Sequence, residues 1–248
     1  MLKKIYTTIC SIWASFAFMF WVVVAYFAYL LVSLVFGSKK DKEFLAFLYG
    51  FVGKLICGSM FLRVERVVHT SYKRNESYVV VSNHQTMIDI PANVVGAPED
   101  ILFKFLGKKE AAKLPFFGLL INRLCILVDR KSEESRRVSY QRMKEEMANG
   151  FSIFVYPEGT RNRTSEPVKA FYNGAFKLAI EMQKPLVVNT LVGIRELNPP
   201  DNFFSYRPGK VYAHWEEPIS TIGMTLNDLD KLKAQAADLM KKRLSPKD

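Results

Sequence analysis

A histidine and an aspartate lie five residues apart where a short β-branched run ends. The run Tyr78–Ser82 is followed by Asn83, His84 and, five residues after the histidine, Asp89. On an ideal helix, positions five residues apart are about 140° from each other, so the two side chains cannot share one helical face. We therefore expect His84 in the turn before a helix and Asp89 in the second turn of that helix. Asp89 would then accept a hydrogen bond from the imidazole and leave the other ring nitrogen free to take a proton.

Two observations bear on whether this pair is catalytic. A lone histidine close to an aspartate is more often structural, but a place at a strand-to-helix turn favours a catalytic role. No serine or cysteine in a recognisable nucleophile context accompanies the pair. The pair therefore favours direct attack by a substrate hydroxyl over a covalent enzyme intermediate.

A second polar cluster, Pro157–Arg161 (PEGTR), follows another apolar run. Gly159 permits an unusual backbone torsion, and Arg161 offers a forked, permanently charged donor that suits phosphate. By itself this cluster is equally typical of a surface turn with solvated arginines.

Together the two clusters, which lie some seventy residues apart, resemble the motif pair of the glycerolipid acyltransferase family. That family includes the bacterial 1-acyl-sn-glycerol-3-phosphate acyltransferases. The resemblance extends over most of residues 60–220, and the motif pair is highly specific. Further matching blocks are Lys104–Arg130, which contains Pro115, then Phe171–Ala175 and Pro185–Val188. Tyr172 and Asn173 stand where many members carry lysines.

The resemblance implies transfer of a fatty acyl group from a thioester to the sn-2 hydroxyl of 1-acyl-sn-glycerol 3-phosphate, which gives phosphatidic acid. His84 would deprotonate the hydroxyl, and Asp89 would orient His84. The groups implied for the acceptor's phosphate and glycerol are Glu158, Gly159, Thr160, Arg161, Arg130, Lys104 and Lys108. The donor would be acyl-CoA or acyl-carrier protein, and neither a metal nor another cofactor is implied.

Other functions stay open on the sequence alone. The acceptor could be another lysolipid, for example one that contains an amino acid, or glycerol 3-phosphate itself. The fold could also belong to an inactive lipid-binding or scaffolding protein, although the presence of both His84 and Asp89 argues against that. A phosphatase or hydrolase is weaker still, because nucleophile context and metal ligands are lacking.

Composition points to a membrane partner. The chain has 248 residues, enough for one sizeable domain, and a formal net charge of +11, which indicates an anionic partner. Scattered lysines and arginines, without zinc-finger spacing or an RNP signature, argue against nucleic acid. Long apolar runs favour anionic lipid headgroups instead. The cysteines Cys10, Cys57 and Cys125 form no CxxC or Cys/His cluster, which predicts buried hydrophobes rather than a disulfide or zinc site.

The first sixty residues hold two long apolar runs. Residues 9–36 carry no charge and as a helix would extend about 40 Å, against a hydrocarbon thickness of about 30 Å. After a charged stretch at 39–43, the run 44–62 is interrupted by glycines and Lys54. Two arrangements stay open: one span followed by an interfacial helix, or a hairpin dipping into one leaflet. Flanking charges favour a cytoplasmic catalytic part, and the resemblance implies a bacterial inner membrane.

From Arg63 onward strand-like runs alternate with helical patterns. This predicts an α/β domain with a mixed, largely parallel sheet flanked by helices. We expect an N-terminal two-helix membrane module at 1–62 and the acyltransferase domain at 63–248. Expected strands are 78–82, 124–128, 151–156, 185–194 and 210–215, and expected helices are 132–149, 172–183 and 225–244. In such sheets, ligand sites form where loops leave the carboxyl ends of strands, which is where the polar clusters fall.

Overall fold

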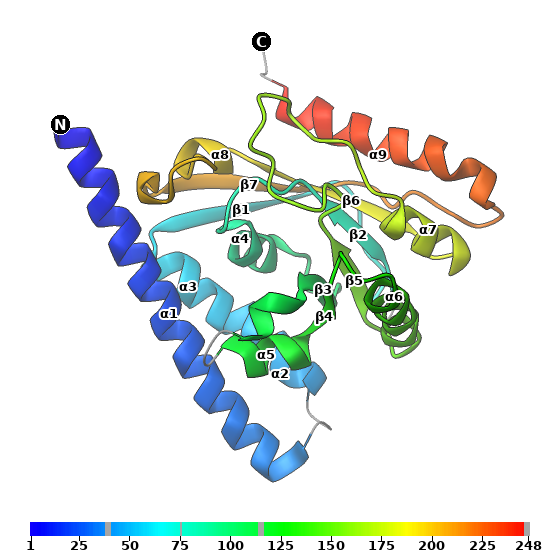
Figure 1. Cartoon of the computed structure of the whole chain (residues 1–248), viewed down its shortest axis with the longest axis horizontal. Helices are drawn as coiled ribbons and strands as arrows, with labels where there is room; N and C mark the ends of the chain where they lie inside the picture. The colour runs from blue at the N-terminus through cyan, green and yellow to red at the C-terminus, as the bar shows by residue number, and fades with distance from the viewer. Residues whose placement is uncertain (38–40, 75, 114–116, 246–248) are drawn as a thin grey trace.

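A twisted sheet forms the centre of the molecule in the computed structural model, which describes residues 1–37, 41–74, 76–113 and 117–245 (Figure 1). Within these residues it has seven strands in the order β1-β7-β6-β2-β5-β3-β4. Their bounds are β1 Leu62–Val68, β2 Val79–Ser82, β3 Phe103–Lys108, β4 Cys125–Val128, β5 Ser152–Val155, β6 Leu186–Val192 and β7 Gly209–Trp215. Strands β2 to β6 run parallel, whereas β7 is antiparallel to β6 and β1 follows the direction of β7. The predicted mixed, largely parallel sheet is confirmed.

The central strands are buried on both faces, which explains why they are continuous apolar runs. Val79, Val80 and Val81 of β2 are fully buried. Val80 faces a cluster that includes residues of α1, α3 and α4, and its neighbours Val79 and Val81 face the cluster built from α6, α7 and α9. Alternate side chains of one strand therefore supply two cores, as the period of two in a β-strand requires.

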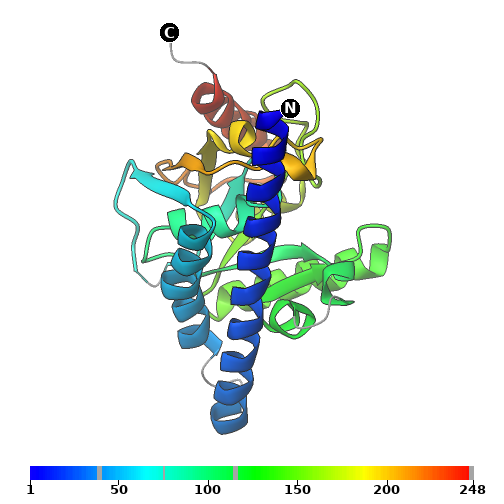
Figure 2. The same cartoon turned by 90° about the vertical axis from the view of Figure 1, so that its left-hand side faces the viewer.

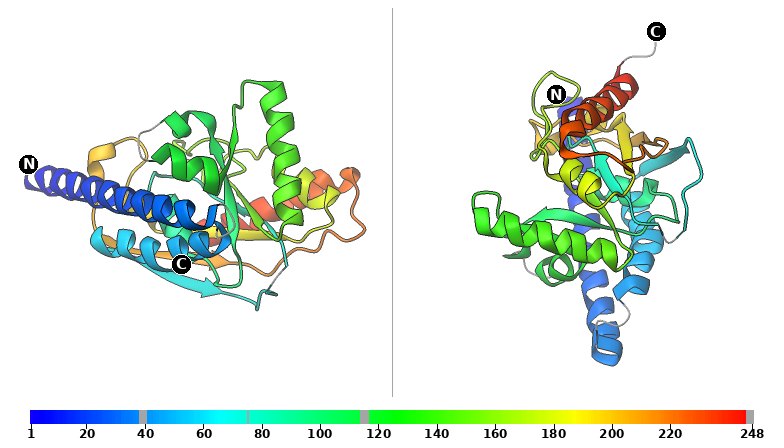
Figure 3. Two further views of the ribbon diagram at one scale, coloured as in Figure 1. Left: turned by 90° about the horizontal axis from the view of Figure 1, so that it is seen from below. Right: turned by 90° about the vertical axis from the view of Figure 1, so that its right-hand side faces the viewer.

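Helices cover both faces of the sheet (Figure 3). One side carries α1 (Leu2–Phe36), α3 (Gly53–Ser59) and α4 (Asp89–Gly96), with α2 (Asp41–Phe47) and α5 (Phe117–Leu124) packed beside α1. The other side carries α6 (Glu133–Ala148), α7 (Gly174–Glu181) and α9 (Leu229–Leu244). The one-turn helix α8 (Ile194–Leu197) lies next to β7.

Helix α1 is long and apolar enough to cross a membrane, and most of its surface is exposed. Small side chains on one stripe of it, such as Ala14 and Ala17, are buried against the domain. The backbone N–H of Tyr206 donates to Ser11 Oγ at 3.0 Å, which ties the helix to a distant loop. The opposite stripe exposes large apolar residues, among them Ile9, Ile12, Trp13, Phe16, Phe20, Phe27 and Leu31.

The second apolar run folds back along α1 (Figure 2). It forms α2, a short π-helix at Leu48–Val52 and α3, and it shares a buried cluster with α1. The second run therefore packs against the first. The placement of both runs across or along a bilayer and the division of the chain at residue 62 stay predictions. Lys39 and Lys40 of the charged stretch, and Pro115, lie outside the described residues.

Every strand and helix predicted in the catalytic part is present, with small differences at the ends. Helix α7 begins at Gly174 rather than Tyr172, because the Tyr172 N–H donates to the Pro157 carbonyl at 2.8 Å and holds that residue against a loop. Helix α9 is preceded by a 3₁₀ turn at Leu226–Asp228, where Thr225 and Asp228 form a capping box.

Candidate active site

His84 and Asp89 form a close pair between β2 and α4. Nδ1 of His84 lies 2.8 Å from Oδ2 of Asp89. The Asp89 side chain is buried and the imidazole is 19% exposed, so the histidine can meet a substrate and the aspartate cannot. Among the described residues, the other ring nitrogen of His84 has no hydrogen-bond partner. This geometry is that of a base with one nitrogen oriented and the other open.

The carboxylate of Asp89 also holds the turn that carries the histidine. It accepts hydrogen bonds from the backbone N–H of Gln85 at 2.6 Å, from the N–H of Thr86 at 2.9 Å and from the Thr86 hydroxyl at 3.0 Å. Helix α4 begins at Asp89, so the prediction of Asp89 in the second helical turn was wrong. The physical reason is that residues 85–88 form a turn that folds back on the carboxylate and itself bridges the five-residue spacing.

Asn83 fixes the other side of His84 to the sheet. Its side-chain amide donates to the Leu191 carbonyl at 3.0 Å, and its side-chain oxygen accepts from the Leu191 N–H at 2.8 Å. This reciprocal pair takes the place of a backbone ladder step between β2 and β6. The histidine is thus held by its two chain neighbours as well as by Asp89.

Glu158 connects the two sequence motifs. Its Oε1 accepts from the His84 N–H at 2.9 Å and its Oε2 from the Lys169 N–H at 2.9 Å. Burial raises the pKa of the Glu158 carboxyl, and the two N–H donors act in the opposite direction. Both oxygens are bound to backbone and the side chain is buried, so Glu158 holds the His84 turn and the Lys169 segment together. Glu158 thus joins the two loops, and its predicted contact with the acceptor stays a prediction.

Gly159 and Thr160 also shape this loop. Gly159 has φ +72°, and a Cβ there would lie 2.6 Å from Cε2 of Tyr172. The Thr160 hydroxyl accepts from Nζ of Lys169 at 2.7 Å. The backbone N–H of Asn162 donates to the His84 carbonyl at 2.6 Å, which closes the loop over the histidine turn.

Replacement of Gly159 with alanine is expected to destabilise the fold by about 1–2 kcal/mol, because an L-residue is strained at positive φ. Adding Tyr172→Ala should recover only the part of the lost stability that comes from the clash between the new Cβ and the Tyr172 ring. The exposed ring can move away, but the positive φ of residue 159 cannot change. Urea unfolding of the two single variants and the double variant separates these contributions. A Gly159→Ala protein as stable as the parent chain would contradict the strained positive φ that we assign to this position.

Tyr156 forms one wall of the histidine site. Its ring stacks on the imidazole with centroids 4.1 Å apart and an interplanar angle of 18°. Burial raises the pKa of the Tyr156 phenol well above its usual value, and the charge of Asp89 adds to that effect. The phenol therefore stays neutral and presents the face of its ring to the imidazole of His84.

A buried chain of amides holds that tyrosine. Asn93 Nδ2 donates to the Tyr156 hydroxyl at 3.0 Å, and Asn189 Nδ2 donates to Asn93 Oδ1 at 2.5 Å. Tyr156 and Asn93 were not predicted as site residues. The available signal was weak: Tyr156 directly precedes the second motif, and Asn93 is a polar residue in an apolar helix.

A pocket of about 450 Å³ opens beside the second motif, with Tyr156, Pro157 and Gly159 on one side. Its other walls are largely apolar and come from β3, β4, β5, α6 and α7, with Leu106, Val128, Met143, Val155 and Ala175 among them. Arg130 and Arg136 also line it. Partial burial lowers the pKa of the Arg130 guanidinium, opposed by Tyr172 and Glu110. A partly desolvated cation without a carboxylate partner among the described residues favours an anionic ligand.

The remaining cations predicted for the phosphate site lie in different places in the structure. Arg161 is half-buried, directly precedes Asn162, and has no ion pair among the described residues. Lys108 lies at the carboxyl end of β3 in an exposed ion pair with Glu110 at 3.3 Å. Lys104 lies near the start of β3, where its ammonium is buried against Glu146 at 2.7 Å. Lys104 is therefore removed from the predicted phosphate site, because its charge is already paired away from the loops at the strand ends.

Metal-ligand chemistry and disulfides are not indicated in the part of the chain that the structure describes. There, no group of three or more histidine, cysteine or acidic side chains could hold a metal ion. Cys10, Cys57 and Cys125 are free thiols, and burial raises the pKa values of Cys57 and Cys125 to about 12. These two thiols stay protonated at neutral pH, so they are unsuited to act as nucleophiles.

Fold and site together define a class of protein in which a histidine–aspartate pair lies at the carboxyl edge of a largely parallel sheet. The acyltransferase family model matches residues 63–191, which include both motifs. The chain belongs to the acyltransferase family.

Known proteins support this assignment at two levels. A relative from Caenorhabditis elegans is 31% identical over 165 residues, which are 65% of this chain and 57% of that protein. The 1-acyl-sn-glycerol-3-phosphate acyltransferase of Haemophilus influenzae is 29% identical over 196 residues, 75% of this chain and 76% of that protein. The crystal structure of the 1-acyl-sn-glycerophosphate acyltransferase PlsC from Thermotoga maritima shares the fold, with a TM-score of 0.78, 24% identity and coverage of 97% and 95% of the two chains.

Proposed function

We propose that this protein transfers a fatty acyl group from an acyl thioester to the sn-2 hydroxyl of 1-acyl-sn-glycerol 3-phosphate and so forms phosphatidic acid. The observation that carries the proposal is the His84–Asp89 pair at 2.8 Å, whose second imidazole nitrogen is open beside the second motif. The relatives from Haemophilus influenzae and Mus musculus are named for this acceptor, which supports the choice.

The chemistry follows from the open nitrogen. Nε2 of His84 takes the proton of the acceptor hydroxyl as the oxygen attacks the thioester carbonyl. The tetrahedral intermediate then collapses, the C–S bond breaks, and the thiolate leaves and takes the proton from the imidazolium. Asp89 stays ionised throughout and stabilises the imidazolium, and the face of Tyr156 contributes to the same effect.

The pocket beside the second motif suits an amphiphile. An alkyl chain can lie against Leu106, Val128 and Met143, while Arg130 and Arg136 supply positive charge. Arg161, on the loop that closes over the His84 turn, is a further cation without an ion pair among the described residues and is available to the acceptor phosphate. Guanidinium groups bind phosphate through two parallel hydrogen bonds, which orient the phosphate as well as balance its negative charge.

We also propose that α1 holds the enzyme at a membrane, with the catalytic domain on the cytoplasmic side of a bacterial inner membrane. The exposed apolar stripe of α1 and the net charge of +11 support a location at an anionic bilayer surface. Flotation of the purified chain with anionic vesicles tests the attachment, and recovery of the chain only in the soluble fraction would refute it.

An acyl transfer assay with the purified full chain tests the activity. Lysophosphatidic acid, glycerol 3-phosphate and amino-acid-containing lysolipids are each offered with acyl-CoA and with acyl-carrier protein. We expect phosphatidic acid from lysophosphatidic acid at the highest kcat/KM. Acylation of another lysolipid with lysophosphatidic acid left unused would overturn the proposed acceptor, and no acylation of any acceptor would overturn the activity.

Arg161→Ala is expected to raise the KM for lysophosphatidic acid about 10- to 100-fold, since a charged hydrogen bond contributes about 1.5–3 kcal/mol. The KM for the acyl donor should be unchanged. Arg163→Ala is the matched control, because Arg163 is exposed on the same loop. Steady-state kinetics in mixed micelles measure both constants. An unaltered acceptor KM in the Arg161 variant would remove this arginine from the site.

A further inference from the structure

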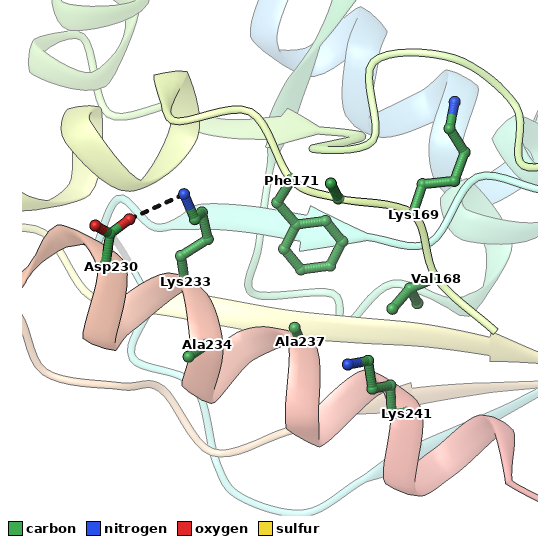
Figure 4. Close-up of a pocket in the computed structure, with 9 residues that line it drawn as sticks. Val168, Lys169, Phe171, Asp230, Lys233, Ala234, Ala237 and Lys241 are labelled. Carbon is green, nitrogen blue, oxygen red and sulfur yellow. Dashed lines mark ion pairs between the residues drawn. The ribbon is translucent and has the colours of Figure 1, made fainter. Parts of the chain in front are cut away.

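A second pocket lies between α9 and the segment Val168–Phe171 (Figure 4). Its volume is about 310 Å³. The floor is apolar and is formed by Val168, Phe171, Ala234 and Ala237. We call this pocket the lysine groove, because Lys169, Lys233 and Lys241 also line it.

Positive charge in the lysine groove exceeds negative charge. Asp230 is the acidic residue that lines it, and its carboxylate is paired with Lys233 at 3.0 Å. Lys233 also donates to Asn173 Oδ1 at 2.9 Å, which fixes its position. Within the described residues, Lys169 and Lys241 have no carboxylate within ion-pairing distance. A ligand with several negative charges therefore complements the groove better than a monoanion does.

The groove is directly connected to the histidine site. Nζ of Lys169 donates to the Thr160 hydroxyl at 2.7 Å, and its backbone N–H donates to Oε2 of Glu158 at 2.9 Å. The other oxygen of the same carboxylate accepts from the His84 N–H at 2.9 Å. The buried Glu158 side chain therefore links the Lys169 end of the groove to the backbone of His84. From there the groove follows α9 from Lys241 to Lys233, about 12 Å along the helix axis (Figure 4).

The lysine groove lies on the side of the sheet away from α1. Helix α9 packs into the cluster of α6 and α7, whereas α1 packs into the cluster on the other face. Figure 1 shows α9 above the sheet and α1 along the left side of the molecule. With α1 as the proposed membrane attachment, the groove would face the aqueous side. This position suits a soluble anion better than a lipid headgroup.

We infer that the lysine groove binds the nucleotide end of a coenzyme A thioester, an inference that rests on the proposed acyl transfer. That end carries a flat base and three phosphate groups, which match an apolar floor rimmed by lysines. The volume of the groove is of the size of small-ligand sites. The long pantetheine arm then runs from the groove past Thr160 toward His84 and brings the thioester next to the acceptor hydroxyl that His84 deprotonates.

Direct binding tests the site without turnover. Adenosine 3′,5′-bisphosphate is titrated calorimetrically into the full chain in detergent. Lys241→Gln is expected to weaken binding about tenfold. Asp230→Asn should tighten binding, because it removes the negative charge beside Lys233. Lys231→Gln is the matched control, since this exposed lysine is on the same helix but does not line the groove.

Kinetics with two donors test its use in the reaction. Lys241→Gln should raise the KM for acyl-CoA and leave two quantities unchanged: the acceptor KM, and the turnover of an S-acyl pantetheine that lacks the nucleotide. An equal loss with both donors overturns the assignment. The assignment is also overturned if Lys241→Gln impairs only the use of acyl-carrier protein, or if it weakens only the binding of anionic vesicles.

The failures of the two proposals are distinguishable. A chain that binds the bisphosphate, with opposite effects of Lys241→Gln and Asp230→Asn, but acylates no lysolipid keeps the groove and loses the proposed function. A chain that acylates lysophosphatidic acid from acyl-CoA, while neither substitution changes bisphosphate binding, keeps the function and loses the groove.

Discussion

Replacement of His84 with alanine is expected to lower kcat for acyl transfer about 10²- to 10⁴-fold, the range that positioned general bases contribute. The reason is that Nε2 is the open proton acceptor of a pair whose other nitrogen is already bound by Asp89 at 2.8 Å. The acceptor KM should change little, because the imidazole takes a proton rather than holding the phosphate. Steady-state kinetics of the purified variant at saturating donor measure both constants.

Two controls distinguish lost chemistry from lost structure. His69→Ala is the matched variant, since His69 is an exposed histidine next to the edge strand β1 and should leave kcat unchanged. Added imidazole should restore part of the rate of His84→Ala by entering the space beside Tyr156. Turnover of the His84 variant within a few fold of the parent chain would refute the assignment of His84 as the base.

The second large effect is expected for Asp89→Asn, with kcat lowered on the order of 10²- to 10³-fold. The carboxylate is the acceptor that orients His84, Gln85 and Thr86. An amide supplies one oxygen and one donor and carries no charge, so it neither enforces the tautomer nor stabilises the imidazolium. The double variant His84→Ala/Asp89→Asn should be no slower than His84→Ala alone, because the two residues act as a unit.

Asp100→Asn is the control for Asp89→Asn, because Asp100 is a partly exposed aspartate that pairs with Arg74. Circular dichroism and thermal unfolding of both variants establish that the fold is kept at the assay temperature. A strictly additive double variant would mean that Asp89 does not act through the histidine, and the pair would then lose its proposed role.

Much of the sheet was predictable because its inner strands are uninterrupted apolar runs. Strand β1 escaped prediction, since Arg63, Glu65 and Arg66 obscure its pattern, and an edge strand tolerates such charges where an inner strand does not. Strand β3 escaped for another reason: Lys104 suggests a ligand contact in the sequence, yet it is a buried partner of Glu146 in the fold.

The histidine–aspartate contact was predictable because it is local, five residues apart in one turn. The partners that complete the site are not local. Tyr156 reaches His84 only because β2 and β5 pair in parallel, so that both chains leave the sheet at one edge. Glu158 reads as a charge that shapes a phosphate pocket, and only the meeting of two loops shows that its oxygens are bound to backbone. The role of a side chain that depends on the order of the strands in the sheet cannot be predicted from the spacing of residues along the sequence.

The packing of α1 has a mechanical consequence for an enzyme held at a bilayer. One stripe of α1 is buried against the rest of the protein at helical spacing, through Ala14, Ala17, Ala25 and Tyr29. The helix is therefore packed onto the domain along its length and is not a flexible tether. This packing predicts that the catalytic domain moves little relative to α1 and keeps a nearly constant height above the lipid surface. Depth and tilt of the imidazole are therefore built into the fold. A lipid hydroxyl has to rise to that fixed depth to react, which restricts acceptors by where their hydroxyl sits in the bilayer.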